Sequence, residues 1–177
     1  MRVLALIFNG FEEEEAVAPF ALLKRAGIEL TIASNNKTVT GSHNISLTNI
    51  ELLENIDYTN YDCLLLPGGA HYKFLRESIT VHNIINHFVN ENKIIAAICA
   101  APTILGMLGH LKNKKYTCFS SMNEDFNGIY IDEGVVVDNN FITAKSVAYS
   151  LDFAYAIIEK LLGREHLNDI FTKIYKK

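Results

Sequence analysis

Four short, mainly apolar segments constrain the fold of this chain more than any other feature. They occupy residues 3–8, 28–33, 63–66 and 93–98. Segments with the composition of helices separate them, such as residues 20–25, which end before Gly27. Strands of a parallel sheet are apolar on both faces because helices cover both sides of the sheet. The pattern therefore predicts an α/β doubly wound fold with a mostly parallel sheet.

The rest of the chain continues this alternation without a linker or a repeat. We expect the first helix to begin near Glu15, because Pro19 fits the first turn of a helix. Further helices are expected at residues 71–77, 81–90, 100–108, 151–162 and 165–175. Further strands are expected at residues 38–42 and 44–48, as a hairpin, and at 116–119, 135–137 and 141–144. Residues 1–177 are therefore expected to form a single domain.

The composition restricts the classes of function. The 177 residues are 49% hydrophobic and 20% charged, which is typical of a globular domain with a full-sized core. The formal net charge of −4 argues against a nucleic acid or an anionic membrane as partner. Three cysteines do not form a disulfide framework and suit a reducing compartment, so we expect a cytoplasmic protein. The apolar run at residues 3–8 is too short for a signal peptide or a membrane span.

Cys99 is the first candidate for chemistry. It lies where the expected strand at residues 93–98 turns into a helix that carries Pro102 in its first turn. The small side chains of Ala97 and Ala100 suit a tight turn of the nucleophile-elbow type. The N–H groups and the dipole at a helix start favour a thiolate over a thiol, so we expect a lowered pKa for Cys99. The alternative is a small buried residue that takes no part in a reaction.

Three of the expected strands end next to chemically distinctive residues. The first ends before Gly10 and a run of four glutamates, the third before Gly68 and Gly69, and the next before Cys99. Ligands of open α/β sheets bind beyond the carboxyl ends of the strands. If these strands are parallel neighbours, their ends meet at one crevice, and Cys99 lies in a site.

Glu15 is the glutamate of this run that we expect to point inward, because apolar residues follow it. Burial near a thiolate would keep its carboxyl group protonated, so that it donates a hydrogen bond to the sulfur. The backbone N–H groups at Gly68, Gly69 and Ala100 are candidates for binding a developing oxyanion. A solvated helix start is the alternative for the other glutamates, and a sharp turn is the alternative for Gly68.

Two further residues are accessory candidates. His71 follows the glycine pair and is the histidine best placed to act as a general base, and Cys118 is a candidate resolving thiol for an oxidised Cys99. For both, a packed structural residue is the alternative, and Cys63 is expected in the core. The other histidines are interpreted as surface residues: His43, His82, His87, His110 and His166. Their spacing is not that of a zinc site and no nucleotide-binding glycine motif occurs, so we expect no metal and no other cofactor.

Three segments resemble the motifs of the ThiJ/PfpI superfamily, in its branch of the parkinsonism-associated protein deglycase and bacterial relatives. They are residues 9–19 (NGFEEEEAVAP), 66–69 (LPGG) and 96–103 (AAICAAPT). The resemblance implies a flavodoxin-like, class I glutamine amidotransferase-like three-layer sandwich that forms a homodimer. It also implies a reactive, oxidisable thiolate at Cys99 and a protonated acid in contact with it at Glu15.

The same resemblance implies a pocket lined by Gly69 and Ala100, but the chain departs from the superfamily pattern nearby. Ala100 occupies the position of a histidine in the protease branch, so peptidase activity is not expected. Phe119 and Ser120 replace a His-Pro or aromatic-Pro pair, so no histidine base comes from that loop. Residues 144–149 (AKSVAY) replace a Ser-Arg-Gly-Pro-Gly-Thr stretch and keep its positive charge.

Three functions remain open. The first is a cofactor-independent glyoxalase or protein deglycase, in which the Cys99 thiolate adds to a 2-oxoaldehyde or its adduct and Glu15 relays a proton. The second is a redox sensor or oxidative-stress protein, in which Cys99 is oxidised to a sulfinate. The third is a hydrolase or amidase of small molecules, which Ala100 disfavours. The expected partners are accordingly a small aldehyde or glycated substrate and a second copy of the chain.

Overall fold

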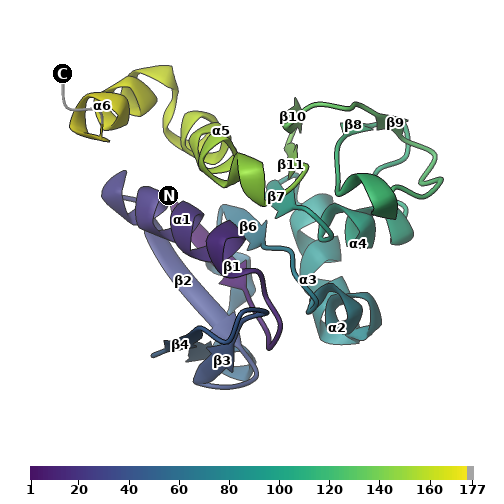
Figure 1. Cartoon of the computed structure of the whole chain (residues 1–177), viewed down its shortest axis with the longest axis horizontal. Helices are drawn as coiled ribbons and strands as arrows, with labels where there is room; N and C mark the ends of the chain where they lie inside the picture. Colours follow the sequence, from purple (N-terminus) through teal and green to yellow (C-terminus); the bar gives the residue numbers. More distant parts are fainter. Residues whose placement is uncertain (175–177) are drawn as a thin grey trace.

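The centre of the fold is a seven-stranded sheet in the order β10–β11–β7–β6–β1–β2–β5 (Figure 1). The computed structural model describes residues 1–174. Every neighbouring pair in this sheet is parallel except β10 and β11. The strands are β1 (Arg2–Leu6), β2 (Glu29–Ser34), β5 (Glu51–Leu52), β6 (Cys63–Leu66), β7 (Ile94–Ile98), β10 (Val135–Asp138) and β11 (Phe141–Ala144). The predicted mostly parallel sheet is confirmed.

Helices cover both faces of the sheet and make a three-layer sandwich (Figure 1). α1, α5 and α6 pack on the face reached by Val3 and Ala5, and α2, α3 and α4 pack on the face reached by Leu4 and Leu6. Val3 and Ala5 alternate with Leu4 and Leu6 along β1 because successive side chains of a strand point to opposite faces. The helices are α1 (Glu13–Arg25), α2 (Tyr72–Glu77), α3 (Ile79–Asn90), α4 (Pro102–Met107), α5 (Ser150–Leu162) and α6 (Arg164–Ile174).

Two short strand pairs lie outside this sheet. β3 (Thr38–Thr40) and β4 (Ser46–Thr48) pair antiparallel, which confirms the predicted hairpin. β8 (Lys115–Tyr116) pairs in parallel with β9 (Ile129–Tyr130). The strand expected at residues 116–119 is therefore shorter than predicted. The chain leaves it because the N–H of Phe119 donates to the carbonyl of Cys99, at 2.8 Å, instead of to a neighbouring strand.

Several helix boundaries differ from the expectations by one or two residues. α1 begins at Glu13, so Pro19 lies beyond the first turn, and acidic side chains in that first turn favour the earlier start through the helix dipole. α4 begins only at Pro102 and has six residues. α6 extends to Ile174, and Tyr175, where this helix was expected to end, lies outside the described residues. Across residues 1–174, none of the helices combines the length and the apolar character that a bilayer crossing needs.

Candidate active site

The carboxyl ends of β7, β6 and β1 meet at a pocket of about 580 Å³. These strands are neighbours, and β1 is also the point where the strand order reverses, since β2 and β6 flank it on opposite sides. The pocket is lined by Glu12, Glu14, Glu15, His43, Cys99, Phe119, Ser146 and Val147. The structure therefore brings the predicted pair of Cys99 and Glu15 together at one site.

Cys99 sits on a strained turn directly after β7. Its φ is +62°, and the other non-glycine residues with positive φ in the described chain are all asparagines. Such a backbone costs about 1–3 kcal/mol and persists only where its surroundings hold it. Here the Cys99 N–H donates to the carbonyl of Ala144 at 2.8 Å, and the Cys99 carbonyl accepts from Phe119. Both bonds fix the thiol at the pocket, as expected for a nucleophile elbow.

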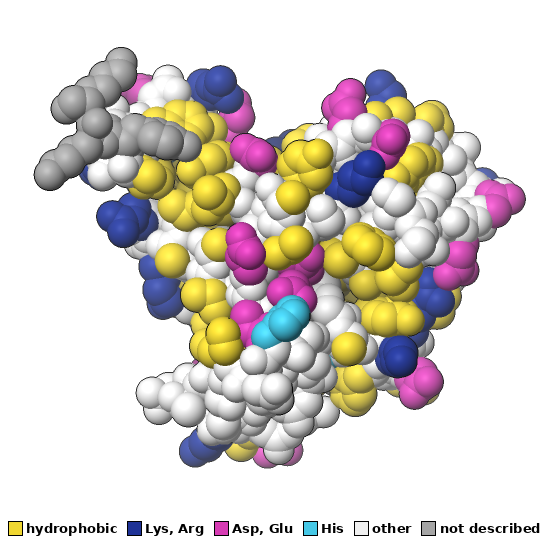
Figure 2. Space-filling view, viewed as in Figure 1, with side chains coloured by type: hydrophobic (Ala, Val, Ile, Leu, Met, Phe, Trp, Pro, Cys, Tyr) yellow, Lys and Arg dark blue, Asp and Glu magenta, His cyan; other side chains and the backbone are white. Residues whose placement is uncertain are grey.

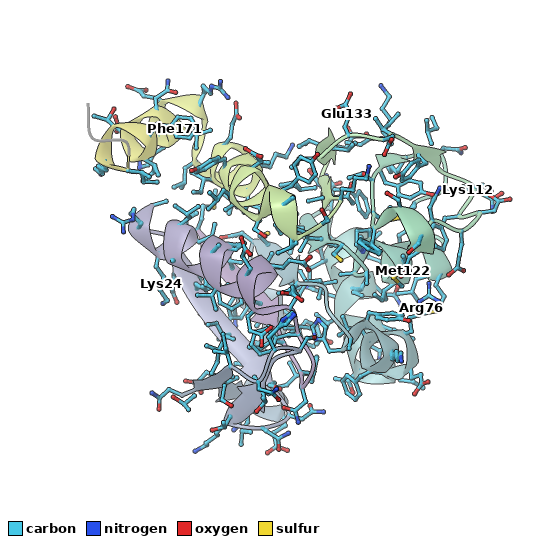
Figure 3. All side chains as sticks on the ribbon, in the orientation of Figure 1. Lys24, Arg76, Lys112, Met122, Glu133 and Phe171 are labelled. Atoms are coloured by element: carbon cyan, nitrogen blue, oxygen red, sulfur yellow. The ribbon has the colours of Figure 1, made fainter. Side chains whose placement is uncertain are left out.

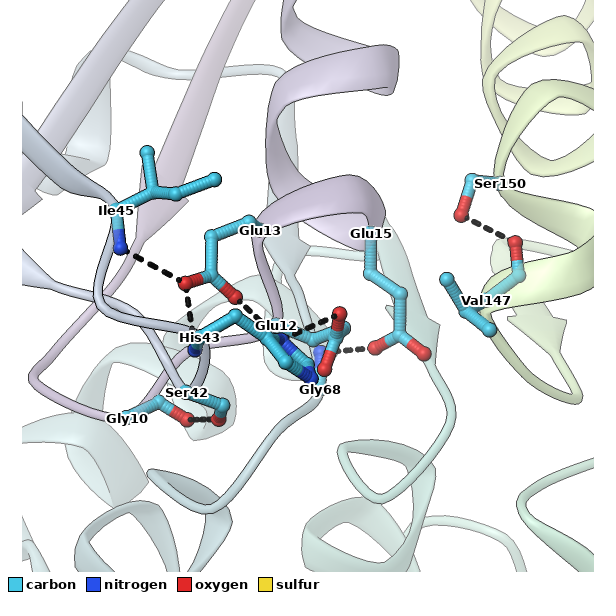
Figure 4. Close-up of polar contacts among 10 residues, drawn as sticks. All are labelled: Gly10, Glu12, Glu13, Glu15, Ser42, His43, Ile45, Gly68, Val147 and Ser150. Carbon is cyan, nitrogen blue, oxygen red and sulfur yellow. Dashed lines mark hydrogen bonds and ion pairs between the residues drawn. The ribbon is translucent and has the colours of Figure 1, made fainter.

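Glu15 is the buried acid of the site, with a relative exposure of 1%. Its Oε2 accepts a hydrogen bond from the Gly68 N–H at 3.0 Å (Figure 4), and its side chain also forms a hydrogen bond with Cys99. Burial raises the pKa of Glu15 to about 7, although these two hydrogen bonds oppose the change. The expectation of a carboxyl group that burial keeps protonated agrees with this direction.

The pKa of Cys99 is raised, so the expectation of a lowered value is wrong. Burial is the largest cause, followed by the negative charge of Glu15, while backbone N–H groups of Ala100 and Gly69 act in the lowering direction. The helix dipole is a poor counterweight because α4 is short and begins three residues after Cys99. A thiolate therefore forms most readily when Glu15 holds the proton, since its charge then no longer opposes ionisation.

Gly68 and Gly69 bring backbone close to the two reactive groups. A Cβ at Gly68 would lie 2.4 Å from Glu15 Oε2 and 2.7 Å from Cys99 Cβ. Gly69 has a φ of +97°, and a Cβ there would lie 2.3 Å from the backbone nitrogen of Glu12. A side chain at either position would displace the site. The glycine pair thus makes a sharp turn and also lets the backbone approach Glu15 and Cys99 closely. That its N–H groups bind an oxyanion remains a prediction.

His71 is a structural residue in this fold and not a free base. It is 2% exposed, its Nδ1 accepts from the Phe8 N–H at 3.2 Å, and its Nε2 lies 2.9 Å from the carbonyl of Pro67. A ring that accepts at Nδ1 and donates at Nε2 is neutral. Burial lowers the pKa of His71 to about 4. Both ring nitrogens are occupied, and His71 does not line the pocket, so the structure contradicts the suggested general base.

Cys118 and Cys63 are also placed in the interior. Cys118 is fully buried in the core between the sheet and α2, α3 and α4, whereas Cys99 packs against the core on the other face. Burial raises the pKa of Cys118 to about 11, and raises the pKa of Cys63 as well. Cys118 does not line the pocket, which argues against the suggested resolving thiol. Cys63 is fully buried, as expected for a core residue.

His43 is the pocket residue that the sequence analysis missed. Its side chain is 68% exposed, but Nδ1 lies 3.0 Å from Glu13 Oε2 and 3.5 Å from Glu12 Oε1 (Figure 4). Glu13 Oε1 also accepts from the N–H groups of His43, at 2.7 Å, and of Ile45, at 3.3 Å, and so ties the hairpin to α1. No local spacing indicates this contact, because about thirty residues separate the partners.

Glu12, Glu13 and His43 offer three ligand atoms within 4.8 Å of one another. In residues 1–174 they are the group with the chemistry to hold a metal ion. Their own interactions already satisfy much of this group: Glu13 accepts two backbone N–H bonds through one oxygen, and its hydrogen bond raises the pKa of His43. The expectation of no metal remains untested.

Comparisons with known proteins show which family this chain resembles. A model of the DJ-1/PfpI family matches residues 1–160. Protein DJ-1 homolog B of Arabidopsis thaliana is 36% identical over 169 residues, which cover 93% of this chain but only 39% of that protein. A deglycase of Pyrococcus horikoshii is 33% identical over 149 residues, covering 82% of this chain and 90% of the relative.

The fold agrees as well. The crystal structure of Drosophila melanogaster DJ-1beta superposes with a TM-score of 0.92 at 31% identity, over 98% of this chain and 96% of that one. The match extends through all three layers and includes the segments that carry Cys99 and Glu15. The chain therefore belongs to the DJ-1/PfpI family.

Proposed function

We propose that this protein is a cysteine-dependent, cofactor-independent enzyme of the glyoxalase or deglycase type, acting on 2-oxoaldehydes or their adducts. One observation carries the proposal: a buried Glu15, with a pKa raised to about 7, forms a hydrogen bond with Cys99 at the pocket. An acid that titrates near neutral pH can both give and take a proton. The deglycase name of the Pyrococcus relative supports the same class of reaction.

The first step is addition. The Cys99 sulfur, as thiolate, attacks the aldehyde carbon of methylglyoxal, forming a C–S bond while the carbonyl π electrons move to oxygen. Glu15 donates its proton to that oxygen, giving a neutral hemithioacetal and a carboxylate. The N–H groups of Gly69 and Ala100 lower the pKa of the Cys99 sulfur, and we expect them also to stabilise negative charge that develops beside it.

The second step moves a proton within the substrate. The Glu15 carboxylate removes the hydrogen of the carbon attached to sulfur as a proton, and an enediolate forms with its negative charge on the former ketone oxygen. The proton of the adjacent hydroxyl group passes to that oxygen, and Glu15 returns its own proton to the former ketone carbon, which leaves a thioester of lactate on Cys99. Water hydrolyses the thioester, so that methylglyoxal and one water give lactate and free Cys99. Neither an oxidant nor a cofactor is needed. When the substrate is an adduct of methylglyoxal with a thiol or an amine, Cys99 replaces that thiol or amine at the same carbon and releases it, and the later steps are unchanged.

Lactate formation from methylglyoxal without glutathione tests this proposal. Wild type should show many turnovers, Cys99→Ser none, and Glu15→Gln a rate at least about a hundredfold lower, the range of a lost general acid–base. Cys118→Ser is the matched thiol control and should keep the activity, because Cys118 lies in the other core. A folded wild type that makes no lactate would refute the glyoxalase reaction.

A redox role is the second candidate, and the same geometry favours it. Cys99 is partly exposed at the pocket, and a protonated Glu15 together with the Gly69 and Ala100 N–H groups suits the oxygen atoms of a sulfinate. Stoichiometric oxidation of Cys99 by dilute peroxide, without aldehyde turnover, would establish this role. Mass spectrometry after peroxide treatment should find the sulfinate at Cys99 in wild type. In Glu15→Gln the oxidation of Cys99 should stop before the sulfinate.

We also propose that the protein is a homodimer of the cytoplasm. Three free cysteines in the chain suit a reducing compartment. Apolar side chains on the α1 and hairpin side, including Val17 at 42% and Ile45 at 56% exposure, suit a second copy of the chain. Sedimentation equilibrium should give a dimer for wild type and a monomer for Val17→Glu. Ile79→Glu, on α3, is the control and should remain dimeric.

A further inference from the structure

The mouth of the pocket carries an excess of carboxylates. Glu12, Glu14 and Glu15 all line it, and Glu13 contacts the same nitrogen of His43 as Glu12 does. Glu15 is buried next to Cys99, whereas Glu14 is exposed and Glu12 is half-buried. We call Glu12 and Glu14 the acidic rim. Figure 2 shows acidic side chains gathered around a histidine near the centre of this face.

The rim has little positive charge to balance it. Among the lining residues, which all belong to the described part of the chain, His43 is the one that can become a cation, and it is already paired with Glu13 and Glu12. Lys145 neighbours the lining residue Ser146, but its ammonium group is bound to Asp132. Figure 3 shows Lys24, Arg76 and Lys112 near the edges of the molecule. A ligand at Cys99 therefore meets a negative field.

The remaining walls do not supply a site for an anion. Phe119 and Val147 are apolar, and Ser146 offers one hydroxyl group. Phosphate and carboxylate groups are usually bound by arginine, lysine or clustered backbone N–H groups. The N–H groups of Gly69 and Ala100 are directed at the sulfur of Cys99 and not at the rim.

We propose that the acidic rim selects substrates by charge, so that the pocket accepts cationic carbonyl adducts best, neutral ones less well and anionic ones poorly, with Glu14 as the specificity-determining residue. This inference rests on the proposed function for its substrate class. The effect of the acidic rim on charged reagents does not rest on the proposed function, because any reagent that reaches Cys99 passes the same carboxylates. In water, one rim carboxylate about 7 Å from a singly charged reagent changes the rate of reaction of that reagent on the order of threefold. The rate rises for a cation and falls for an anion. Removal of one rim carboxylate should therefore lower the preference for cation over anion by up to about tenfold.

Methanethiosulfonate reagents that differ only in charge test the rim without any turnover. The trimethylammonioethyl, methyl and sulfonatoethyl reagents are each reacted with the protein, and modification of Cys99 is followed by mass spectrometry. Each rate is divided by the rate for 2-mercaptoethanol to remove intrinsic reactivity. We expect the order cation, neutral, anion for wild type. In Glu14→Gln the cation-to-anion ratio should fall several-fold, and in Glu14→Lys it should reverse. Glu165→Gln, which removes an exposed glutamate on α6, is the matched control and should keep the wild-type ratio.

Salt provides an independent readout. The preference should shrink when the ionic strength rises from about 0.01 M to about 0.5 M, because salt screens charges exposed to solvent. Glu14 is exposed, so its variants are expected to fold, and circular dichroism verifies this. Equal normalised rates for the three reagents in wild type, or a ratio that Glu14→Gln and Glu14→Lys leave unchanged, would overturn the proposal.

The substrate arm uses hemithioacetals of methylglyoxal with thiocholine, 2-mercaptoethanol and 2-mercaptoethanesulfonate, which differ in charge but share the reacting carbons. The ratio kcat/KM should follow the order cation, neutral, anion. Turnover without discrimination would refute charge selection and leave the proposed function intact. Charge-dependent labelling of Cys99 without turnover of any adduct would refute the proposed function and leave the rim as an electrostatic filter for a reactive thiol.

Discussion

Glu15→Gln should make the protein more stable at alkaline pH while removing its activity. Glutamine has the shape of glutamate, and its amide oxygen can still accept the hydrogen bond that Gly68 donates at 3.0 Å. The variant lacks only the ionisation of a side chain that is 1% exposed. The cost of burying that charge should therefore appear as a difference in the free energy of unfolding.

The magnitude follows from the change in pKa. Burial raises the pKa of Glu15 from 4.5 to about 7, so the folded protein holds a proton that the unfolded chain has lost across this interval. Stability from this group is complete below about pH 4.5 and is lost as the pH rises to about 7. At about 1.4 kcal/mol per pH unit, the total loss in the wild type is about 3 kcal/mol. Glu15→Gln does not suffer this loss.

Urea unfolding of both proteins at about pH 5 and about pH 8 measures the effect. The stability of Glu15→Gln relative to wild type should increase by about 2–3 kcal/mol between the two conditions, while the titrations of groups that do not interact with Glu15 cancel in the difference. Glu14→Gln removes an equal charge from an exposed neighbour and should show much less change. A difference between Glu15→Gln and wild type that is the same at both pH values would show that burial of Glu15 does not carry this cost.

Three further predictions concern the surroundings of the site. Gly69→Ala should lower the free energy of unfolding by at least about 2 kcal/mol, because φ is +97° and a Cβ would meet the Glu12 nitrogen at 2.3 Å. Gly27→Ala is the control for backbone strain alone, since its φ is +78° but no atom lies within 4 Å of the added Cβ. It should lower the free energy of unfolding by about 1 kcal/mol in the same urea assay. His71→Phe should cost about 2–4 kcal/mol, since it leaves two buried backbone groups unpaired, but should not move the pH midpoint of Cys99 alkylation by iodoacetamide. That midpoint should lie above the ordinary range of a thiol in wild type, because burial and the negative charge of Glu15 both raise the pKa of Cys99. It should move to lower pH in Glu15→Gln, where that charge is gone, and an unmoved midpoint would show that the two groups are not coupled.

The expected elements that rest on local pattern agree with the structure most closely. The apolar runs predict β1, β2, β6 and β7, since a strand covered on both faces must be apolar along its whole length. Cys99 at a strand-to-helix turn is likewise visible in the small residues around it. Boundaries were less accurate where a distant contact decides them. The strand expected at residues 116–119 ends early because Phe119 donates to the carbonyl of Cys99.

What the sequence by itself determined is the apolar strands of the sheet, the turn at Cys99 and the inward position of Glu15, because each follows from residues adjacent in the chain. Only the tertiary structure decided the chemistry of the side chains. Burial raises the pKa of Cys99 where the local helix start predicts the opposite, and neighbouring loops occupy both nitrogens of His71. His43 reaches the pocket from a hairpin about thirty residues away. Protonation states and contacts of this kind depend on desolvation and on groups distant in sequence, and no local pattern records either one.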